Sequence, residues 1–182
     1  HYVPTVLYGD REDAQEMAEV LRLTHAFAAP YALRFRRSGD IVSTAAARRQ
    51  GTIAVTVEMG GSGTVTPYAL KITQEGIERV MAEIGILKEP NLGAPCETRV
   101  LRLTGKHNYL YARQDGLFEP AAEIGEDVTE GQTAGWIHQP EAPWEEATEV
   151  VFQITATILC KRIPGRVQPG DCLFQLGQED TD

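Results

Sequence analysis

The stretch TIAVTVEMGGSGTV, residues 52–65, runs from a β-branched apolar segment into an acid, Glu58, and then into three glycines within four residues. Val, Ile and Thr favour strands. Residues 52–57 lack regular alternation, which is typical of a strand buried on both faces in a parallel sheet. The glycines permit a turn in which a ligand can come close to the backbone. The stretch therefore predicts a buried strand that presents a carboxylate at the edge of a sheet.

The residues before this stretch alternate between helix and strand signals. Asp10 is expected to cap a helix with one apolar face, which ends at Pro30. Residues 31–35 alternate as a short strand would. After a loop at residues 38–40, the Ala-rich and Arg-rich residues 41–50 favour a helical turn.

The residues after the glycines continue the same alternation. Thr66 and Pro67 mark the start of a further helix, because a Thr cap followed by Pro in the first turn is a common helix beginning. An apolar stripe follows, and Gly85 is a plausible end of the helix. Helices alternating with strands predict an α/β layer arrangement.

The character of the sequence then changes to strands and turns. We expect an α/β domain over residues 1–90, a linker over 91–98 and a β-domain over 99–182. GEDVTEG at 125–131 is echoed by PGRVQPG at 164–170, each with an apolar residue before a turn and a strand after it. Two similar halves of about 40 residues predict a small β-barrel or β-sandwich built by duplication.

Composition limits the partners of the chain. A formal net charge of −9 disfavours nucleic acid or an anionic membrane surface as the main partner, because both are bound through clustered Lys and Arg. The apolar runs are far below the roughly 18 residues that span a bilayer, and no secretory signal is visible. Three widely spaced cysteines without a CxxC pair argue against a disulfide framework or a thiolate zinc site. A cytoplasmic protein is expected.

Several segments together resemble one known family. TVEMGGSGTV, ALKITQEGIERVMAEIGIL, DGLFEPAAEIGEDVTEGQTAGWI and PGRVQPGDCLFQLG are similar to the C-terminal half of succinylglutamate desuccinylase/aspartoacylase family proteins. The resemblance covers nearly the whole chain. It implies a zinc-carboxypeptidase-like α/β fold followed by a β-domain whose pattern is shared with biotinyl and lipoyl domains.

The resemblance also implies chemistry, namely a zinc-dependent hydrolase that removes an acyl group from an N-acyl amino acid. Members of the family hold one zinc through an HxxE segment and a later His, and neither segment is present here. The zinc ligands are therefore expected upstream of this chain, and no metal ligand is assigned to its own residues. The isolated chain is expected to be inactive.

Five residues are candidates for the site. The family's catalytic Glu falls at Glu58, which implies a general base and acid, although an acid at a strand end is also commonly an ordinary solvated residue. Gly60 and Gly61 are candidates for close approach to substrate or simply for a turn with positive φ. Arg48 and Arg49 are candidates for binding a substrate carboxylate, with exposed helix Arg as the alternative.

Two other functional classes are alternatives to the hydrolase. The first is a carrier module, but residues 137–148, where such modules present a modifiable Lys, contain none. The second is a non-catalytic scaffold or binding module that lacks the metal site. The partners expected for the hydrolase are a small-molecule N-acyl amino acid and either further copies of the chain, as a homo-oligomer, or the missing N-terminal half.

Overall fold

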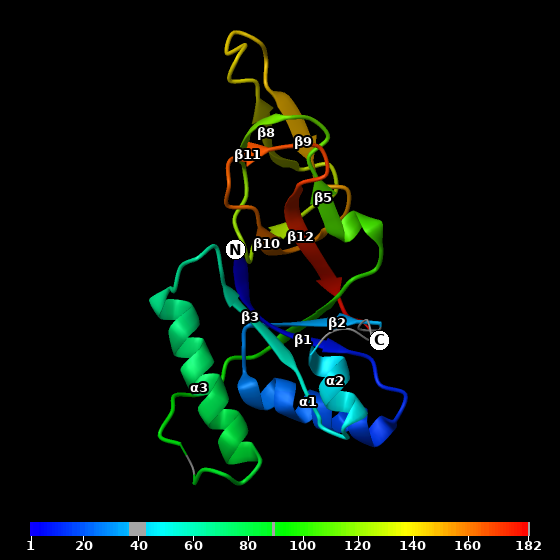
Figure 1. Ribbon diagram of the computed structural model, residues 1–182, viewed down its shortest axis with the longest axis vertical. Coiled ribbons are helices and arrows are strands. Elements are labelled where there is room, and N and C mark those ends of the chain that lie inside the picture. Colours follow the sequence, from blue (N-terminus) through cyan, green and yellow to red (C-terminus); the bar gives the residue numbers. More distant parts are fainter. Residues whose placement is uncertain (37–42, 89, 182) are drawn as a thin grey trace. The chain divides into compact units, whose positions relative to one another are not determined.

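The chain forms two compact units in a computed structural model that describes residues 1–36, 43–88 and 90–181 (Figure 1). The first, here called the α/β unit, comprises Pro4–Arg102 with Asp180–Asp182. The second, here called the β unit, comprises His1–Val3 and Leu103–Glu179. Among the described residues, no helix combines the length and the apolar character that a membrane crossing requires.

Four strands form the sheet of the α/β unit. They lie in the order β3-β1-β2-β4. β1 and β2 pair in parallel, as do β2 and β4. The strand bounds are β1 Tyr2–Gly9, β2 Tyr31–Phe35, β3 Thr56–Gly60 and β4 Arg99–Arg102, and the helices are α1 Ala14–Phe27, α2 Ser43–Arg49 and α3 Pro67–Glu83.

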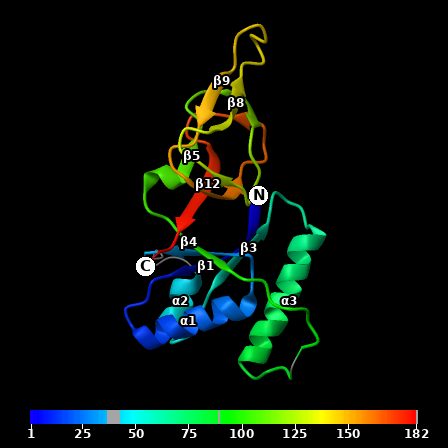
Figure 2. The ribbon, with the colours of Figure 1, turned by 180° about the vertical axis from the view of Figure 1, so that it is seen from behind.

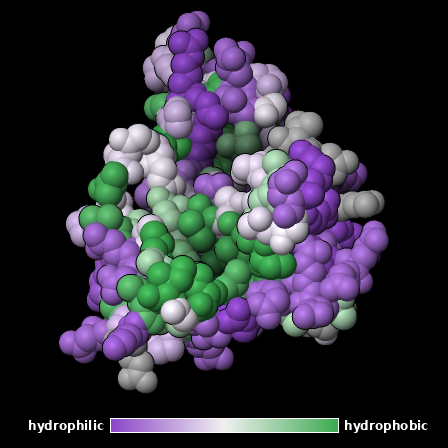
Figure 3. All heavy atoms as spheres, turned by 60° about the horizontal axis from the view of Figure 1, so that its bottom comes forward, coloured by the Kyte–Doolittle hydropathy of each residue, from purple (hydrophilic) through white to green (hydrophobic). Residues whose placement is uncertain are grey.

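The core of the α/β unit lies where α1 and α3 meet the strands. Side chains from both helices and from all four strands form one apolar cluster that includes Val6, Val20 and Phe27. α1 and α3 lie side by side (Figures 1 and 2), and Arg22 bridges them through an ion pair with Glu83 at 2.7 Å. Burial of this cluster accounts for the expected α/β layers. Figure 3 shows that an apolar area also remains on the outer surface of this end of the molecule.

The close contact between these helices depends on Gly76. A Cβ atom built at Gly76 would lie 2.6 Å from the ring of Phe27, the last residue of α1. Glycine is normally unfavourable in the middle of a helix, by about 1 kcal/mol relative to Ala. Its presence in α3 therefore reflects the space that the Phe27 ring occupies.

Two local expectations need correction, and a third concerns residues that the structure does not describe. The N-cap of α1 is Asp13, whose side chain accepts from the Glu16 amide, because Asp10 instead accepts from Arg34. The strand expected over 52–57 is β3 at Thr56–Gly60; it ends the described strand order, and its side chains are mostly half-buried rather than covered on both faces. The expected loop at 38–40 lies outside the described residues.

The expected linker also has a different place in the fold. Residues 91–98 have no regular structure, but they connect α3 to β4 inside the α/β unit. Thr98 Oγ1 donates to the Ala29 carbonyl and the Arg99 amide donates to the Pro30 carbonyl, so the segment is tied to the residues just before β2. Pairing of β4 with β2 thus places Arg99–Arg102 with the α/β unit.

The β unit consists of two four-stranded sheets with matching orders. One has the order β5-β12-β10-β7 and the other β9-β8-β6-β11. Both sheets contribute to one apolar core, in which Phe118 from β6 meets Phe174 from β12 edge to face at 5.9 Å. The bounds are β5 Tyr109–Tyr111, β6 Gly116–Pro120, β7 Asp127–Val128, β8 Thr133–His138, β9 Thr148–Val151, β10 Ala156–Lys161, β11 Arg166–Val167 and β12 Cys172–Glu179, with a 3₁₀ turn at Lys106–Asn108.

The internal repeat seen in the sequence has a structural counterpart. Val128 and Val167 are both buried, and Gly131 and Gly170 both have positive φ, 82° and 92°. The amide of Gly131 donates to the carbonyl of Phe152, which precedes β10, while the amide of Gly170 donates to the carbonyl of Ala112, which precedes β6. The two halves of the β unit therefore repeat the same turn, at the positions where the two sequences echo each other.

The helix contact gives a first prediction. We expect Gly76→Ala to lower the free energy of unfolding by about 1–3 kcal/mol, because overpacking against Phe27 outweighs the gain of about 1 kcal/mol in helix propensity. Urea denaturation of the 182-residue chain measures this. Gln74→Ala, at an exposed position of the same helix, is the control and should change stability little. A stabilised Gly76→Ala variant would show that the contact is not tight.

Candidate functional site

Glu58 lies in the middle of β3 and is half-buried. Its neighbours Val57 and Met59 both pack against the core cluster of the α/β unit. Among the residues that the structure describes, none forms a hydrogen bond or an ion pair with the Glu58 carboxylate. Glu58 is therefore a carboxylate on an ordered strand that no other side chain of the described residues engages.

The chain reverses directly after β3 through four successive residues in the left-handed region. The φ angles are 76° at Gly60, 110° at Gly61, 63° at Ser62 and 71° at Gly63. The Thr64 amide closes the turn by donating to the Gly61 carbonyl at 3.3 Å. Three of the four positions are glycine, the residue that takes this conformation without steric cost. The interpretation that these glycines serve a turn with positive φ is thus confirmed.

Open space surrounds the tip of this turn. A Cβ atom added at Gly61 or at Gly63 would meet no atom of the described residues within 4 Å. Packing therefore does not explain these two glycines, whereas backbone conformation does. Close approach of a substrate to Gly60 and Gly61 stays a prediction.

The turn leads into α3 within a few residues. Thr66 caps the helix by accepting from the Ala69 amide at 3.2 Å, and Pro67 occupies its first turn, as the sequence predicts. Gly85 follows the helix with a positive φ of 76°. The turn thus connects β3 directly to α3, and these neighbouring elements together fix the position of Glu58.

Arg48 and Arg49 lie in the last turn of α2. Arg48 is half-buried and Arg49 is exposed. Both side chains take part in an interaction within the chain. Among the described residues, no direct contact joins either arginine to Glu58, and their role in binding a carboxylate stays a prediction.

An ion-pair network in the α/β unit was not anticipated. Arg34 Nε lies 2.7 Å from Asp10 and Arg34 Nη1 lies 3.0 Å from Asp180, which also lies 3.6 Å from Arg102. Burial raises the pKa of neighbouring Tyr8 above its ordinary value, and the charge of Arg34 opposes that shift. The network ties the end of the chain to β2, so Arg34 has a structural role. Sequence alone gave no signal for a contact between residues so far apart.

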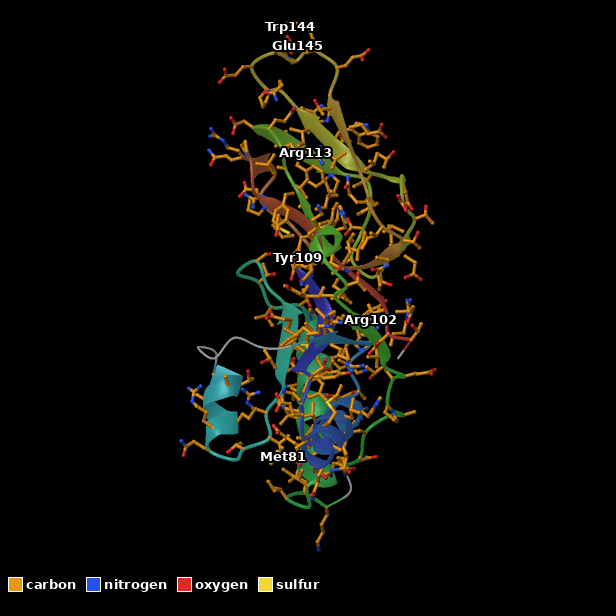
Figure 4. The ribbon with its side chains drawn as sticks, turned by 90° about the vertical axis from the view of Figure 1, so that its right-hand side faces the viewer. Met81, Arg102, Tyr109, Arg113, Trp144 and Glu145 are labelled. Atoms are coloured by element: carbon orange, nitrogen blue, oxygen red, sulfur yellow. The ribbon has the colours of Figure 1, made fainter. Side chains whose placement is uncertain are left out.

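A groove in the β unit was also missed. It has a volume of about 500 Å³ and is lined by the 3₁₀ turn, β5 and β9, with basic side chains from Lys106, His107 and Arg113. Tyr109 and Tyr111 stack at 6.2 Å on this side, and Figure 4 labels Tyr109 and Arg113. Burial raises the pKa of Tyr109, whose hydroxyl accepts from Gln175.

The histidines of the chain are scattered. His1 and His25 lie near the start of the chain, and His107 lies in the 3₁₀ turn. His138 on β8 lies 2.6 Å from Glu119 on β6. Within residues 1–36, 43–88 and 90–181, no three His, Cys, Asp or Glu side chains gather where they could hold a metal ion. The described residues therefore do not fit a zinc site.

The chain is similar to proteins of one known family. Residues 1–84 match the model of the succinylglutamate desuccinylase/aspartoacylase catalytic domain. The N-alpha-acetyl-L-2,4-diaminobutyric acid deacetylase of Halomonas elongata is 30% identical over 169 residues, which are 92% of this chain and 49% of that protein.

Solved structures agree with this match. A succinylglutamate desuccinylase/aspartoacylase from Rhodobacter sphaeroides superposes with a TM-score of 0.89 at 28% identity, over 100% of this chain and 55% of that one. The product-bound ectoine utilization protein from Ruegeria pomeroyi shares the fold, with a TM-score of 0.89 at 24% identity over 97% of this chain and 54% of that one.

The chain spans about half the length of each of these relatives. The family match falls on the α/β unit, and the structural likeness extends through the β unit. Residues 1–84 therefore resemble the catalytic domain of the succinylglutamate desuccinylase/aspartoacylase family, and the chain has the fold of a solved protein of that family.

Proposed function

We propose that the chain is part of a zinc-dependent deacylase that hydrolyses the amide bond of an N-acyl amino acid. The observation that carries this proposal is the match of residues 1–84 to the family's catalytic domain, a segment that contains Glu58 and the glycine turn. The name of the Halomonas elongata relative, a deacetylase of an N-acetylated amino acid, supports the same substrate class.

Glu58 is the general base and then the general acid in this proposal. Amide hydrolysis needs a group that removes a proton from the attacking water and later delivers a proton to the leaving amine nitrogen. A carboxylate can do both when it is held on an ordered strand and is not engaged by another side chain, as Glu58 is among the described residues. The products are a free amino acid and the carboxylate of the acyl group.

The zinc ion belongs to another part of the enzyme in this proposal. Because the described residues do not offer three ligands in one place, the ligands are assigned to the part of the relatives that this chain does not match. The chain's own contribution is then proton transfer and substrate binding.

Arg48 and Arg49 are proposed to bind the α-carboxylate of the substrate. A guanidinium presents paired N–H donors that match a carboxylate. Their place at the end of α2, seven residues before β3 begins, puts both in the same segment of the catalytic domain as Glu58.

A binding module without chemistry is the alternative, in which the described residues, where no three ligand side chains gather, have a scaffold role. The β unit supplies a further observation. Trp144 is 80% exposed in the connection between β8 and β9, where Figure 4 shows it beside Glu145 at the tip. This connection carries no Lys, so attachment of a swinging arm there is not proposed.

Replacing the proposed base tests the assignment. In the complete enzyme, which includes the zinc-binding half, we expect Glu58→Gln to lower kcat by about 10²–10⁴-fold, the usual loss for a general acid–base group. Zinc content measured on the same sample should be unchanged. Glu78→Gln, an exposed acid on α3, is the control and should keep full activity. Normal turnover in Glu58→Gln would refute the role of this residue.

Metal content of the chain alone gives an independent test. Because ligands are expected elsewhere, we expect the purified 182-residue chain to hold well under one zinc per molecule after dialysis at neutral pH. Elemental analysis together with intact mass measures the ratio. A tight zinc at one per chain would mean that a ligand set within these residues has been overlooked.

The turn after β3 can be tested through stability. We expect Gly61→Ala to lower the free energy of unfolding by about 1–2 kcal/mol, because an L-residue resists the left-handed region. Ser62→Gly is the matched control at the neighbouring left-handed position, and it should leave stability equal or higher. Equal loss in both variants, measured by urea denaturation, would contradict this account of the turn.

A further inference from the structure

The connection between β8 and β9, residues 139–147, ends in an exposed aromatic side chain surrounded by acids. It is here called the acidic tip, because it carries Glu141, Glu145 and Glu146 and no basic residue. Trp144 lies at its end beside Glu145 (Figure 4) and is more exposed than any other large apolar residue that the structure describes. Tryptophan is among the commonest anchors of protein interfaces, where its large ring is buried by a partner.

The backbone of the acidic tip is held in one conformation. The Ala142 amide donates to the Gln139 carbonyl and the Glu145 amide donates to the Ala142 carbonyl, each at 3.0 Å. Gln139 Nε2 also donates to the Asp115 carbonyl at 2.7 Å, which ties the base of the tip to the connection before β6. Trp144 is therefore presented by an ordered segment, and ordering before binding favours association.

The groove lined by β5 and β9 carries the opposite charge. Its basic residues Lys106, His107 and Arg113 are exposed, and no acid among the described residues pairs with any of them. The acid in the lining, Glu149, is already engaged, because it accepts from Thr133 Oγ1 at 2.6 Å. This surface, here called the basic groove, therefore favours an anionic ligand although the whole chain is acidic.

Tyr109 adds a hydroxyl donor and an aromatic surface to the basic groove. The buried Gln175 accepts from the Tyr2 hydroxyl through Oε1 and donates through Nε2 to the Tyr109 oxygen at 3.1 Å. The hydroxyl hydrogen of Tyr109 then has no acceptor among the described residues and suits a carboxylate oxygen. Tyr111 stacks beside Tyr109 and is 47% exposed, so its ring offers a surface to a further aromatic side chain.

The acidic tip does not occupy the basic groove of its own chain. None of residues 139–147 lines the groove. The two strands that line it, β5 and β9, each pair with one strand only in the described part of the chain, and β9 begins directly after the tip. Because one strand joins the tip to the groove, two copies related by a twofold axis can each offer a tip to the other's groove.

We propose that the acidic tip of one chain docks in the basic groove of a second copy, and that the exchange is reciprocal. The indole of Trp144 packs against the stacked tyrosines within a groove of about 500 Å³, and the carboxylates of the tip meet its basic side chains. Charge complementarity selects this occupant, since the tip is acidic and aromatic and the groove is basic and aromatic. The contact lies in the β unit and does not depend on the proposed deacylase activity.

Exchange of charges between tip and groove tests the docking. In one variant of the 182-residue chain Glu145→Lys and Glu146→Lys reverse the tip, and in another Lys106→Glu and Arg113→Glu reverse the groove. We expect each variant alone to lose the dimer, because like charges then face each other. We expect an equimolar mixture to form a heterodimer, because both of its contacts again join opposite charges. Analytical ultracentrifugation measures association from micromolar to submillimolar concentration.

A single substitution tests the aromatic anchor. We expect Trp144→Ala to raise the Kd of the dimer more than tenfold, because buried tryptophans dominate interface energies. The charge control carries Glu78→Lys and Glu130→Lys, two exposed acids outside the tip, and should dimerise as the unsubstituted chain does. Circular dichroism verifies that every variant folds, and added salt should weaken the unsubstituted dimer.

Three outcomes would overturn the proposal. The first is a chain that stays monomeric over the whole concentration range. The second is a dimer that Trp144→Ala does not weaken, which would assign association to a different surface, such as the exposed apolar residues of α3. The third is a mixture of the two charge-reversed variants that forms no heterodimer although both variants are folded.

Discussion

The backbone reversal at residues 60–63 is the constraint on which the α/β unit depends. Four successive left-handed residues are required to turn the chain from the end of β3 toward α3 within a few positions. The direction of β3 decides which way Glu58 points, and the start of α3 decides that Gly76 meets Phe27. A change in this turn would therefore alter the proposed base and the helix contact together.

Packing and chemistry are coupled along α3. One side of the helix is buried through small residues that allow α1 to approach, and the adjoining side is left apolar and exposed. Among the described residues, the strand before it, β3, pairs along one edge. The same short region thus contributes a packed core toward α1 and exposed apolar surface elsewhere.

Helix ends and turns that depend only on neighbouring residues could be predicted from the sequence. Thr66, Pro67 and Gly85 bound α3 as their capping chemistry indicates, and the two echoed turns identify the halves of the β unit. Errors arose where a distant partner decides the outcome. Asp10 resembles a cap, but Arg34 engages it, and residues 91–98 resemble a linker between domains, but β4 pairs with β2. The candidate site can be predicted only in part from the sequence. The strand and the glycine turn point to Glu58, whereas no local pattern links Arg48 or Arg49 to Glu58.

The two halves of the β unit exchange strands between its two sheets. Each half supplies the two inner strands of one sheet and the two outer strands of the other: β8 and β6 of the first half lie between β9 and β11 of the second, and β12 and β10 of the second lie between β5 and β7 of the first. A single half would hold only a two-stranded ribbon with both edges bare, too little to be stable alone in water. The two halves of the β unit are therefore expected to fold together in one cooperative step, because each sheet is complete only when both halves are present.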